Sequence, residues 1–353
     1  MIQIRSFDGE IEELQQFIVS TWSHDYAGKM AFPLWPTEYF NWQLGINAGV
    51  SRDHLLAAYD DGKLVGCVLG VPYKFQIPSG ILTGTLGSWL SIAPESRRLG
   101  IASQLKAEII ARHAAEGSAF QLGYRYFGSK HSKGSRFWKD DPLSPSQFLG
   151  RVGFLVRVLD APRAAAWNVN MLDRVMIRLF STWYPGPKQR QSTVTVRPYV
   201  PDDLPECLTL IHQQTEPMSL SLRWEADTLG RHLQPGSTGR SLVAVREGRV
   251  VGFVAYHAIP FQGLTTEPVG VIDIVQTTGM SFGEQRCLVD AMLYDLKNLG
   301  AVLALKLRIG DYGVASLLSL GFVPRAADSH LVANWATPRL PIPSSGNRHI
   351  LWR

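Results

Sequence analysis

The sequence predicts an α/β (α+β) protein made of two similar halves. Apolar segments with the pattern of strands and amphipathic segments with the spacing of helices follow one another in the same order twice. The chain has 353 residues, and single hydrophobic cores usually stop growing at roughly 250 to 300 residues. Hydrophobic residues make up 45% and charged residues 18%, a composition that supports a sizeable core. We therefore expect two domains.

The first half is predicted to begin with a short strand and an amphipathic helix. Its clearest signal is a hairpin, because two apolar strands flank the turn Asp60-Asp61-Gly62. A longer strand, a helix, a short strand and a small helix complete this half. The expected ranges are strands 2–7, 54–59, 63–73, 81–92 and 119–124, and helices 11–17, 103–115 and 132–139.

The second half repeats this order. Its hairpin at 241–256 matches the hairpin at 55–70, with Val-Gly at the same offset in both. The copy ends at a Gly-Phe pair, residues 321–322. The expected ranges are strands 193–198, 271–276 and 302–307, helices 202–211 and 283–299, and a closing segment at 315–322.

Residues 94–102 join an apolar strand to a helix through a basic loop that contains glycine. The first turn of a helix leaves about four N–H groups without partners and carries the positive end of the helix dipole. Gly100 and Ala102 are too small to cover those groups, while Arg97 and Arg98 add positive charge. The loop therefore predicts a pyrophosphate site. The alternative is a tight connection with surface arginines.

The order Pro-x-x-Arg-x-x-Gly-x-Ala in this loop resembles the acyl-CoA signature of the GCN5-related N-acetyltransferases (GNAT). The order of strands and helices agrees with that family. The resemblance implies tandem GNAT folds, each a mixed, mostly antiparallel twisted sheet flanked by helices. It also implies acetyl-CoA, or another acyl-CoA, as co-substrate. The residues that would bind it are Leu90, Ser91, Ile92, Arg97, Arg98, Leu99, Gly100, Ile101, Ala102 and Ser103.

The corresponding loop of the second half, residues 276–283, has glycines but no arginine. We therefore expect the first half to bind coenzyme A and the second half to close the acceptor pocket. The predicted organisation is an acyl-CoA-binding domain at 1–160, an apolar connector helix with a Pro/Gly linker at 161–191, a degenerate GNAT-like domain at 192–337 and a C-terminal tail at 338–353.

The connector is apolar over most of a predicted helix at 164–183, which leaves a narrow polar stripe with Asp173, Arg174 and Arg178. We expect this helix to be buried between the two domains. The alternative is a basic interfacial helix in contact with a membrane surface.

In the family, an amine attacks the thioester directly while a base removes a proton and an acid protonates the thiolate. The strand at 81–92 carries no acid, so a carboxylate base is excluded there, although many relatives have a glutamate. Trp138 stands where the family has its acid, a tyrosine, and an indole N–H does not give up its proton near neutral pH. We therefore expect Tyr124 to be the catalytic acid and His131 a second candidate. The alternatives are a tyrosine at the rim of the core and a solvated histidine.

Trp35, Glu38 and Tyr39 lie in the segment that lines acceptor sites in the family. Ring faces with one carboxylate can hold a cationic amine, but Trp35 and Tyr39 also fit the core face of a helix. Some tandem relatives use the terminal carboxylate as base, and residues 350–353 are apolar enough to dock. The alternative for the tail is disorder.

The net charge of +5 suits an anionic ligand such as coenzyme A and does not require nucleic acid. Cys67, Cys207 and Cys287 are far apart in apolar segments, which indicates reduced core thiols in a cytoplasmic protein without a metal site. The start has acids where a signal peptide needs an apolar stretch, and no segment approaches the ~20 apolar residues of a membrane span.

The function that these features favour is acyl-CoA-dependent N-acyl transfer, in its leading form acetyl transfer from acetyl-CoA to the primary amine of a small molecule. One alternative is a protein that binds or senses coenzyme A without turnover. Another is an aminoacyl or long-chain acyl transferase on a tandem scaffold.

Overall fold

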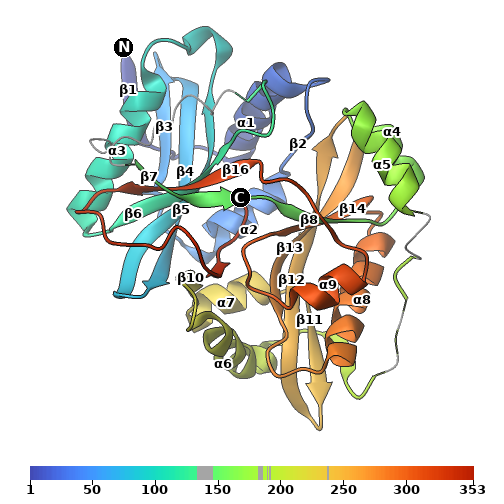
Figure 1. Ribbon diagram of the computed structural model, residues 1–353. Helices are drawn as coiled ribbons and strands as arrows, with labels where there is room; N and C mark the ends of the chain where they lie inside the picture. Colours follow the sequence, from blue (N-terminus) through green and yellow to red (C-terminus); the bar gives the residue numbers. More distant parts are fainter. Residues whose placement is uncertain (133–145, 182–185, 189, 191, 237) are drawn as a thin grey trace.

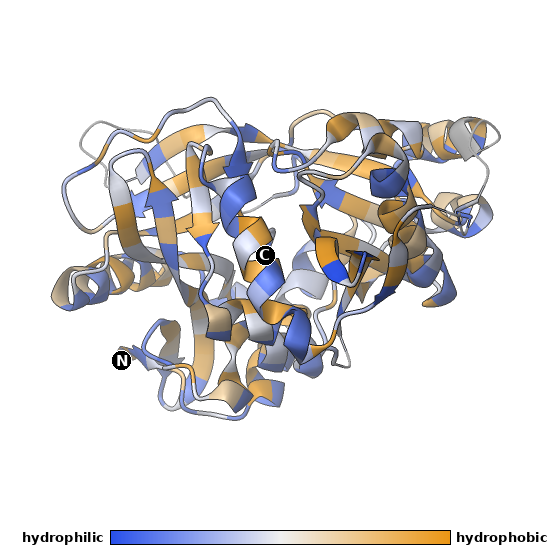
Figure 2. Cartoon of the chain, turned by 90° about the horizontal axis from the view of Figure 1, so that it is seen from below, coloured by the Kyte–Doolittle hydropathy of each residue, from blue (hydrophilic) through white to orange (hydrophobic). Residues whose placement is uncertain are grey.

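The computed structural model describes residues 1–132, 146–181, 186–188, 190, 192–236 and 238–353. Two mixed sheets lie side by side, each flanked by helices, and the C-terminus lies between them (Figure 1). Apolar residues concentrate in the strands of both sheets, whereas the helices alternate between polar and apolar residues (Figure 2). The predicted fold class, an α/β protein with two mixed sheets flanked by helices, is confirmed.

The first sheet has nine strands in the described part of the chain, and most neighbours are antiparallel. Along the main path these are β1 (Ile2–Ser6), β3 (Leu55–Asp60), β4 (Lys63–Ile77), β5 (Gly80–Ile92), β6 (Phe120–Tyr126), β16 (Ser329–Trp335) and β7 (Ser146–Val152). Off this path, β10 (Leu220–Arg223) pairs with β4, and β17 (Arg348–His349) pairs with β10. The pair β5–β6 is parallel.

The second sheet has eight strands in the same described ranges. Along its path these are β15 (Val323–Pro324), β8 (Phe154–Val158), β14 (Leu303–Leu307), β13 (Thr266–Gln276), β12 (Arg249–Gln262), β11 (Gly239–Arg246) and β9 (Thr195–Pro198). The short strand β2 (Phe32–Pro33), from the first half of the chain, pairs with β12. The pair β13–β14 is parallel and corresponds to β5–β6 of the first sheet.

Helices cover the sheets. They are α1 (Ile11–Tyr26), α2 (Thr37–Leu44), α3 (Ile101–Glu116), α4 (Ala161–Trp167), α5 (Met171–Ser181), α6 (Leu204–Thr215), α7 (Ala226–Leu233), α8 (Phe282–Asn298) and α9 (Val314–Ser319). Local periodicity predicted α1, α3, α6 and α8, and both hairpins. The expected helix at 132–139 lies outside the described residues, apart from its first position.

The two sheets exchange strands across the predicted boundary at residue 160. Strand β16 comes from the second half of the chain but lies between β6 and β7, and in Figure 1 it appears as a red strand among the teal and green strands of the first sheet. Strand β8 precedes residue 160 but pairs with β14 and β15 in the second sheet. A single residue, Gly153, separates β7 from β8. The ranges 1–160 and 192–337 therefore do not coincide with the two sheets.

The largest hydrophobic cluster draws on both halves. It includes Phe75 and Leu122 from the first sheet, Phe253 from the second, and Ile350 and Leu351 from the tail. Because the tail packs in this shared core, the expectation of a disordered tail is wrong. The halves are consequently one body and not two modules joined by a linker.

The connector also differs from its prediction. It forms two helices, because the chain leaves helical geometry at Asn168, whose φ is −67° and ψ 133°. One face of helix α4 is buried, with Ala164, Ala165 and Trp167. The indole N–H of Trp167 donates to the carbonyl of Phe261. Most of the large apolar side chains of helix α5 are exposed instead. The expectation of burial between the domains is therefore wrong for α5.

Candidate active site

The first sheet opens between its two parallel strands. Pairing between β5 and β6 ends at Leu86 and Leu122, although β5 continues to Ile92 and β6 to Tyr126. Beyond that point the facing backbone edges of the two strands do not pair with each other. A narrow ligand with amide groups can therefore enter between the strands and form hydrogen bonds like those of a strand.

Two glycines bring the strands together where the opening begins. A Cβ atom on Gly123 would lie 2.9 Å from the carbonyl oxygen of Gly87, and one on Gly87 would overlap the side chain of Gln121. Any other residue at either position would push the strands apart earlier. The glycines therefore define the closed end of the opening.

A bulge turns β5 just beyond this point. The register against β4 shifts between Cys67 and Leu69, and Trp89 adopts a φ of 60°, which is costly for a residue with a bulky side chain. The carbonyl of Trp89 accepts hydrogen bonds from Ser91 Oγ at 3.1 Å and, more weakly, from Cys67 Sγ at 3.6 Å. Strain held in place by packing is typical of functional sites.

Helix α3 begins at the mouth of the opening. Arg98 and Gly100 have φ values of 71° and 75°, and the helix has neither a side-chain cap nor an acidic residue in its first turn. A Cβ on Gly100 would meet only Gln104 Nε2, at 3.8 Å, which is an ordinary van der Waals contact. Its free N–H groups and the helix dipole make this end suitable for a phosphate group.

The two arginines of the loop do different things. Both guanidinium nitrogens of Arg97 donate to the carboxylate of Asp25 on α1, at 2.8 and 2.6 Å, and Nε donates to the carbonyl of Ile92 at 3.2 Å. Arg97 therefore fixes the loop and its charge is neutralised, which differs from the expected role of adding charge at the rim. Arg98 is exposed and keeps its charge at the rim.

Other expected cofactor residues contribute backbone and not side chains. The hydroxyl of Ser91 accepts from the indole of Trp22 at 2.9 Å, and Ile101 is buried in the core. Leu90 and Ile92 are half-buried on β5, while Leu99 and Ser103 are exposed and Ala102 is half-buried. Contacts to a ligand would therefore come mainly from main-chain groups.

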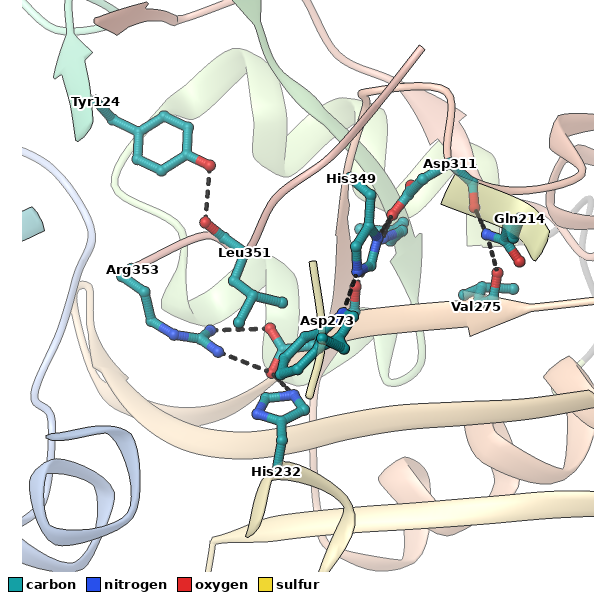
Figure 3. Close-up of polar contacts among 11 residues, drawn as sticks. Tyr124, Gln214, His232, Asp273, Val275, Asp311, His349, Leu351 and Arg353 are labelled. Atoms are coloured by element: carbon teal, nitrogen blue, oxygen red, sulfur yellow. Dashed lines mark hydrogen bonds and ion pairs between the residues drawn. The ribbon is translucent and has the colours of Figure 1, made fainter. Parts of the chain in front are cut away.

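Tyr124 lies on β6 beyond the last β5 pair. Its hydroxyl donates to the main-chain carbonyl of Leu351 at 2.8 Å, as Figure 3 shows, so the tail crosses the opening here. Burial raises the pKa of this phenol, which keeps its proton at neutral pH. His131 follows β6, and its main-chain N–H donates to Ser129 Oγ. Trp138 lies outside the described residues.

The three residues expected to bind the acceptor do not converge. Trp35 and Tyr39 are fully packed in the core with Trp89 and Phe40, whereas Glu38 is exposed on α2. Neighbouring residues in a helix point about 100° apart, so Glu38 cannot share the face of Tyr39. The core interpretation of the aromatic residues is the one that the structure supports.

A buried polar cluster fills the corresponding opening of the second sheet, and sequence reasoning missed it. Asp273 pairs with Arg353 at 2.9 Å and lies 3.3 Å from His232 (Figure 3). It also lies 3.2 Å from His257. Burial alone would raise the pKa of Asp273, but Arg353 and the two histidines hold it well below its usual range. Burial lowers the pKa of His232, which stays neutral.

A second buried group lies beside this cluster. Lys306 donates to Asp311 at 3.1 Å, and His349 lies 2.8 Å from the same carboxylate oxygen. Lys306 comes from β14, Asp311 from the loop after it and His349 from the tail. No local signal in the sequence marks these residues, because their partners come from distant segments.

A small, partly open pocket is lined in part by His232. Its walls come from α2, β4 and α7, where the two halves meet. Among the described residues, Gln43 Nε2 has no hydrogen-bond partner and Arg231 has neither an ion pair nor a hydrogen bond. Unsatisfied donors in a pocket indicate a place for an anionic or polar group. The lining residues are Trp42, Gln43, Tyr73, Thr228, Arg231 and His232.

The start of α8 in the second half is closed by its own side chains. Ser281 Oγ accepts from the N–H of Glu284, and Glu284 accepts from the N–H of Ser281 at 2.8 Å. Glu284 also accepts from Thr193 and Arg246. Hydrogen bonds, above all from Thr193 and Ser281, lower the pKa of Glu284 to about 2. A fixed carboxylate therefore occupies the place that a phosphate would take.

Within the described ranges, no group of three or more His, Cys, Asp or Glu side chains is arranged to hold a metal ion. No described helix is both long enough and apolar enough to cross a membrane.

Comparisons with known proteins agree with this geometry. Residues 30–129 match the family model described as an acetyltransferase (GNAT) domain. No curated protein sequence matches the chain.

Two solved structures are similar in fold. A crystal structure of Saccharomyces cerevisiae N-myristoyltransferase with bound myristoyl-CoA aligns with a TM-score of 0.76 over 100% of this chain and 89% of that chain, at 14% identity. A GCN5-related N-acetyltransferase from Anabaena variabilis aligns with a TM-score of 0.53 over 94% of this chain and 72% of that chain, at 11% identity. Residues 30–129 thus match a GNAT domain, and the fold of the whole chain is similar to that of N-myristoyltransferase.

Proposed function

We propose that this protein is an acyl-CoA-dependent N-acyltransferase whose acyl-CoA lies in the first half. The observation that carries the proposal is the combination of an opening between β5 and β6 with an uncapped helix start at its mouth. The pantetheine arm would take the free backbone groups of β5 beyond Leu86, and the pyrophosphate would take the N–H groups at the start of α3. When bound, the thioester supplies an activated acyl carbon to an attacking amine.

The acyl group is proposed to be short, with acetyl as the leading case. Behind the bulge, five aromatic rings pack against one another, with Trp22 and Trp35 only 4.7 Å apart and Phe40 and Trp89 5.4 Å apart, measured between ring centroids. Tyr39 belongs to the same buried group. Such close packing favours a short acyl group over a long chain in this region. Long-chain transfer remains the competing form, because the similar Saccharomyces enzyme was crystallised with myristoyl-CoA.

The acceptor is proposed to be a primary amine that enters through the pocket above His232. The pocket lies where the halves meet, and Tyr39 links it to the acyl site because its ring contacts both Trp89 and Trp42, at 6.4 and 6.1 Å between centroids. Burial lowers the pKa of His232, so its neutral imidazole can accept a hydrogen bond from an attacking amine. Arg231, without a partner among the described residues, favours an acceptor that also bears a negative group.

Tyr124 is proposed to donate a hydrogen bond to the departing thiolate. It lies at the edge of the opening, and its raised pKa keeps the proton on the phenol. That proton now bonds the carbonyl of Leu351, so the tail must release it during turnover. The same bond favours the alternative of a protein that binds coenzyme A without turnover.

The first experiment measures thiol release from acyl-CoA donors of increasing chain length over a panel of primary amines. We expect acetyl-CoA to be the best donor and longer chains to react more slowly. Preference for a long-chain donor would move the function to the long-chain alternative. Calorimetric binding of coenzyme A without thiol release from any pair would identify a sensing protein.

Tyr124→Phe tests the proton donor. We expect turnover to fall by about tenfold or more, which is ~1.4 kcal/mol of transition-state stabilisation, while coenzyme A affinity is unchanged. Tyr126→Phe, two residues further along the same strand, is the matched control and should keep its turnover. Equal activity of Tyr124→Phe and the wild type would leave Tyr124 as an anchor for the tail.

A further inference from the structure

Helix α5 presents an apolar face to solvent. Met171 and Leu172 are each 76% exposed, and Val175, Met176 and Leu179 are 52, 46 and 58% exposed. Their spacing places all five on one side of the helix. In the described part of the chain, α5 alone carries five of the fourteen large hydrophobic residues that are exposed. A cluster of this kind differs from the scattered apolar residues of an ordinary surface.

The polar side of α5 faces the protein instead. Asp173 pairs with Arg325 at 2.9 Å, and Arg174 Nε donates to the carbonyl of Asn168 at 2.8 Å. Ile177 is the buried apolar residue of this side. The helix is therefore held by polar contacts with its apolar face turned outward, the reverse of an amphipathic helix that packs on its own core.

The size of the face argues against a second copy of this chain as its cover. A fully exposed aliphatic side chain offers roughly 60–120 Å² of apolar area, so the five together offer at most about 400 Å². Each partner in a stable protein interface buries about 800 Å². A lipid surface has no such minimum, because each side chain that enters it contributes separately.

The charge of the surrounding segment favours an anionic surface. Residues 160–190 contain five Lys and Arg residues and two Asp residues, a net charge of +3, whereas the whole chain has +5. Arg163 and Arg190 pair with Glu267 and Asp290 outside the segment, so the charge available beside α5 comes from its other basic residues. Basic residues beside an apolar helix face are typical of helices that lie on membranes with acidic lipids.

We propose that α5 is an interfacial helix that docks the protein on an anionic lipid surface, with Leu172 and Met176 among the side chains that enter the lipid. This role is independent of the acyl-transfer chemistry, because α5 contributes no residue to the opening between β5 and β6 or to the pocket above His232. The proposal replaces the expectation that the whole connector is buried. It takes up the alternative from the sequence analysis, a basic helix in contact with a membrane surface.

The test is sedimentation of the full chain with vesicles of phosphatidylcholine alone or mixed with phosphatidylglycerol. The variant is Leu172→Glu with Met176→Glu. The matched control is Val314→Glu with Leu318→Glu, which changes two residues of α9 that are also four positions apart and exposed, at 49 and 42%. Equal unfolding midpoints of wild type and both variants establish that each is folded.

We expect the wild type to bind the mixed vesicles more tightly than phosphatidylcholine alone and to be released by salt. The α5 variant should lose at least about tenfold in vesicle affinity, and the α9 control should keep it. Absence of wild-type binding, or equal binding by both variants, would overturn the proposal. A wild-type dimer that the α5 variant dissociates, with no vesicle binding, would overturn it in favour of self-association.

Discussion

The two halves place the same elements differently at the point where a parallel strand pair opens and a helix begins. In the first half, the start of α3 has no capping side chain and the strand opening has no charged filling. In the second half, Glu284 caps α8 and the buried Asp273–Arg353 pair lies beside the splayed strands. The comparison shows how one fold can leave a helix start uncapped in one copy and close it with its own side chains in the other.

The bulge position shows the same difference. In β5 two residues, Trp89 and Leu90, lack a direct partner on β4, and in β13 the residue that breaks the register against β12 is Asp273. An aromatic ring at this place closes the core behind the opening, whereas a carboxylate needs counter-charges. Arg353, His232 and His257 provide them.

The largest effect is expected from separating the halves. Residues 1–160 expressed alone lack β16, so β6 loses a neighbour and β7 has no strand to pair with. Exposed strand edges and an uncovered shared core favour aggregation. We expect insoluble or inactive material, measured by light scattering and thiol release. A monodisperse fragment with full activity would contradict the view that the halves are one body.

Removing the Asp273 carboxylate is expected to have a smaller effect, a loss of several kcal/mol in the free energy of unfolding. Asp273→Ala leaves Arg353 buried without its partner, which typically destabilises a protein by about 3–5 kcal/mol. The control is Asp173→Ala, which breaks the exposed pair with Arg325 and should cost at most about 1 kcal/mol. Urea unfolding measures both. Equal losses would mean that the cluster contributes no more than a surface pair.

Ligand binding tests the open helix start. Gly100→Glu should weaken coenzyme A binding by at least about tenfold, because it places a carboxylate at the N–H groups, where it repels phosphate. Gly279→Glu is the matched control: this glycine precedes α8, has a φ of 81° and faces open space. Both glycines have a positive φ, so both variants carry similar backbone strain. A difference in coenzyme A affinity, measured by calorimetry, would therefore come from the position of the added carboxylate. Unchanged affinity in Gly100→Glu would contradict the assignment of the pyrophosphate.

The smallest effect is expected at the closed helix start. Glu284→Gln weakens the capping box and should cost about 1 kcal/mol at neutral pH. The pKa of Glu284 is lowered from 4.5 to about 2 in the folded protein. Its contribution is therefore present above about pH 4.5 and is lost as the pH falls toward 2. The unfolding midpoint of the variant should fall less steeply than that of the wild type as the pH is lowered. Identical pH profiles would show that ionisation of Glu284 does not contribute to stability.

Local signals were sufficient for much of the fold. The Asp60-Asp61-Gly62 turn fixed one hairpin, and apolar spacing fixed the long helices α3 and α8. The loop at 94–102 identified the strand-to-helix junction, because its residues determine the local backbone conformation without distant partners. The partner of Arg97 was not predictable. Asp25 is 72 positions away, and no pattern in either segment indicates that the two residues form an ion pair.

The missed features share one cause. Strand β16 pairs with strands about two hundred residues earlier, and the Asp273–Arg353 pair joins β13 to the tail. Helix α5 was predicted as a helix but placed wrongly, because periodicity locates an apolar face and does not say what covers it. Long-range pairing and the partner of an exposed face are properties of the whole structure.

The exchanged strand also has a consequence for synthesis on the ribosome. Chains usually fold from the N-terminus as they emerge, one domain at a time. Here β7 cannot join the first sheet until β16, which ends at Trp335, has been made. Nearly the entire polypeptide must therefore be translated before its first sheet can close, and during that time the edge of β6 is exposed to any other nascent strand.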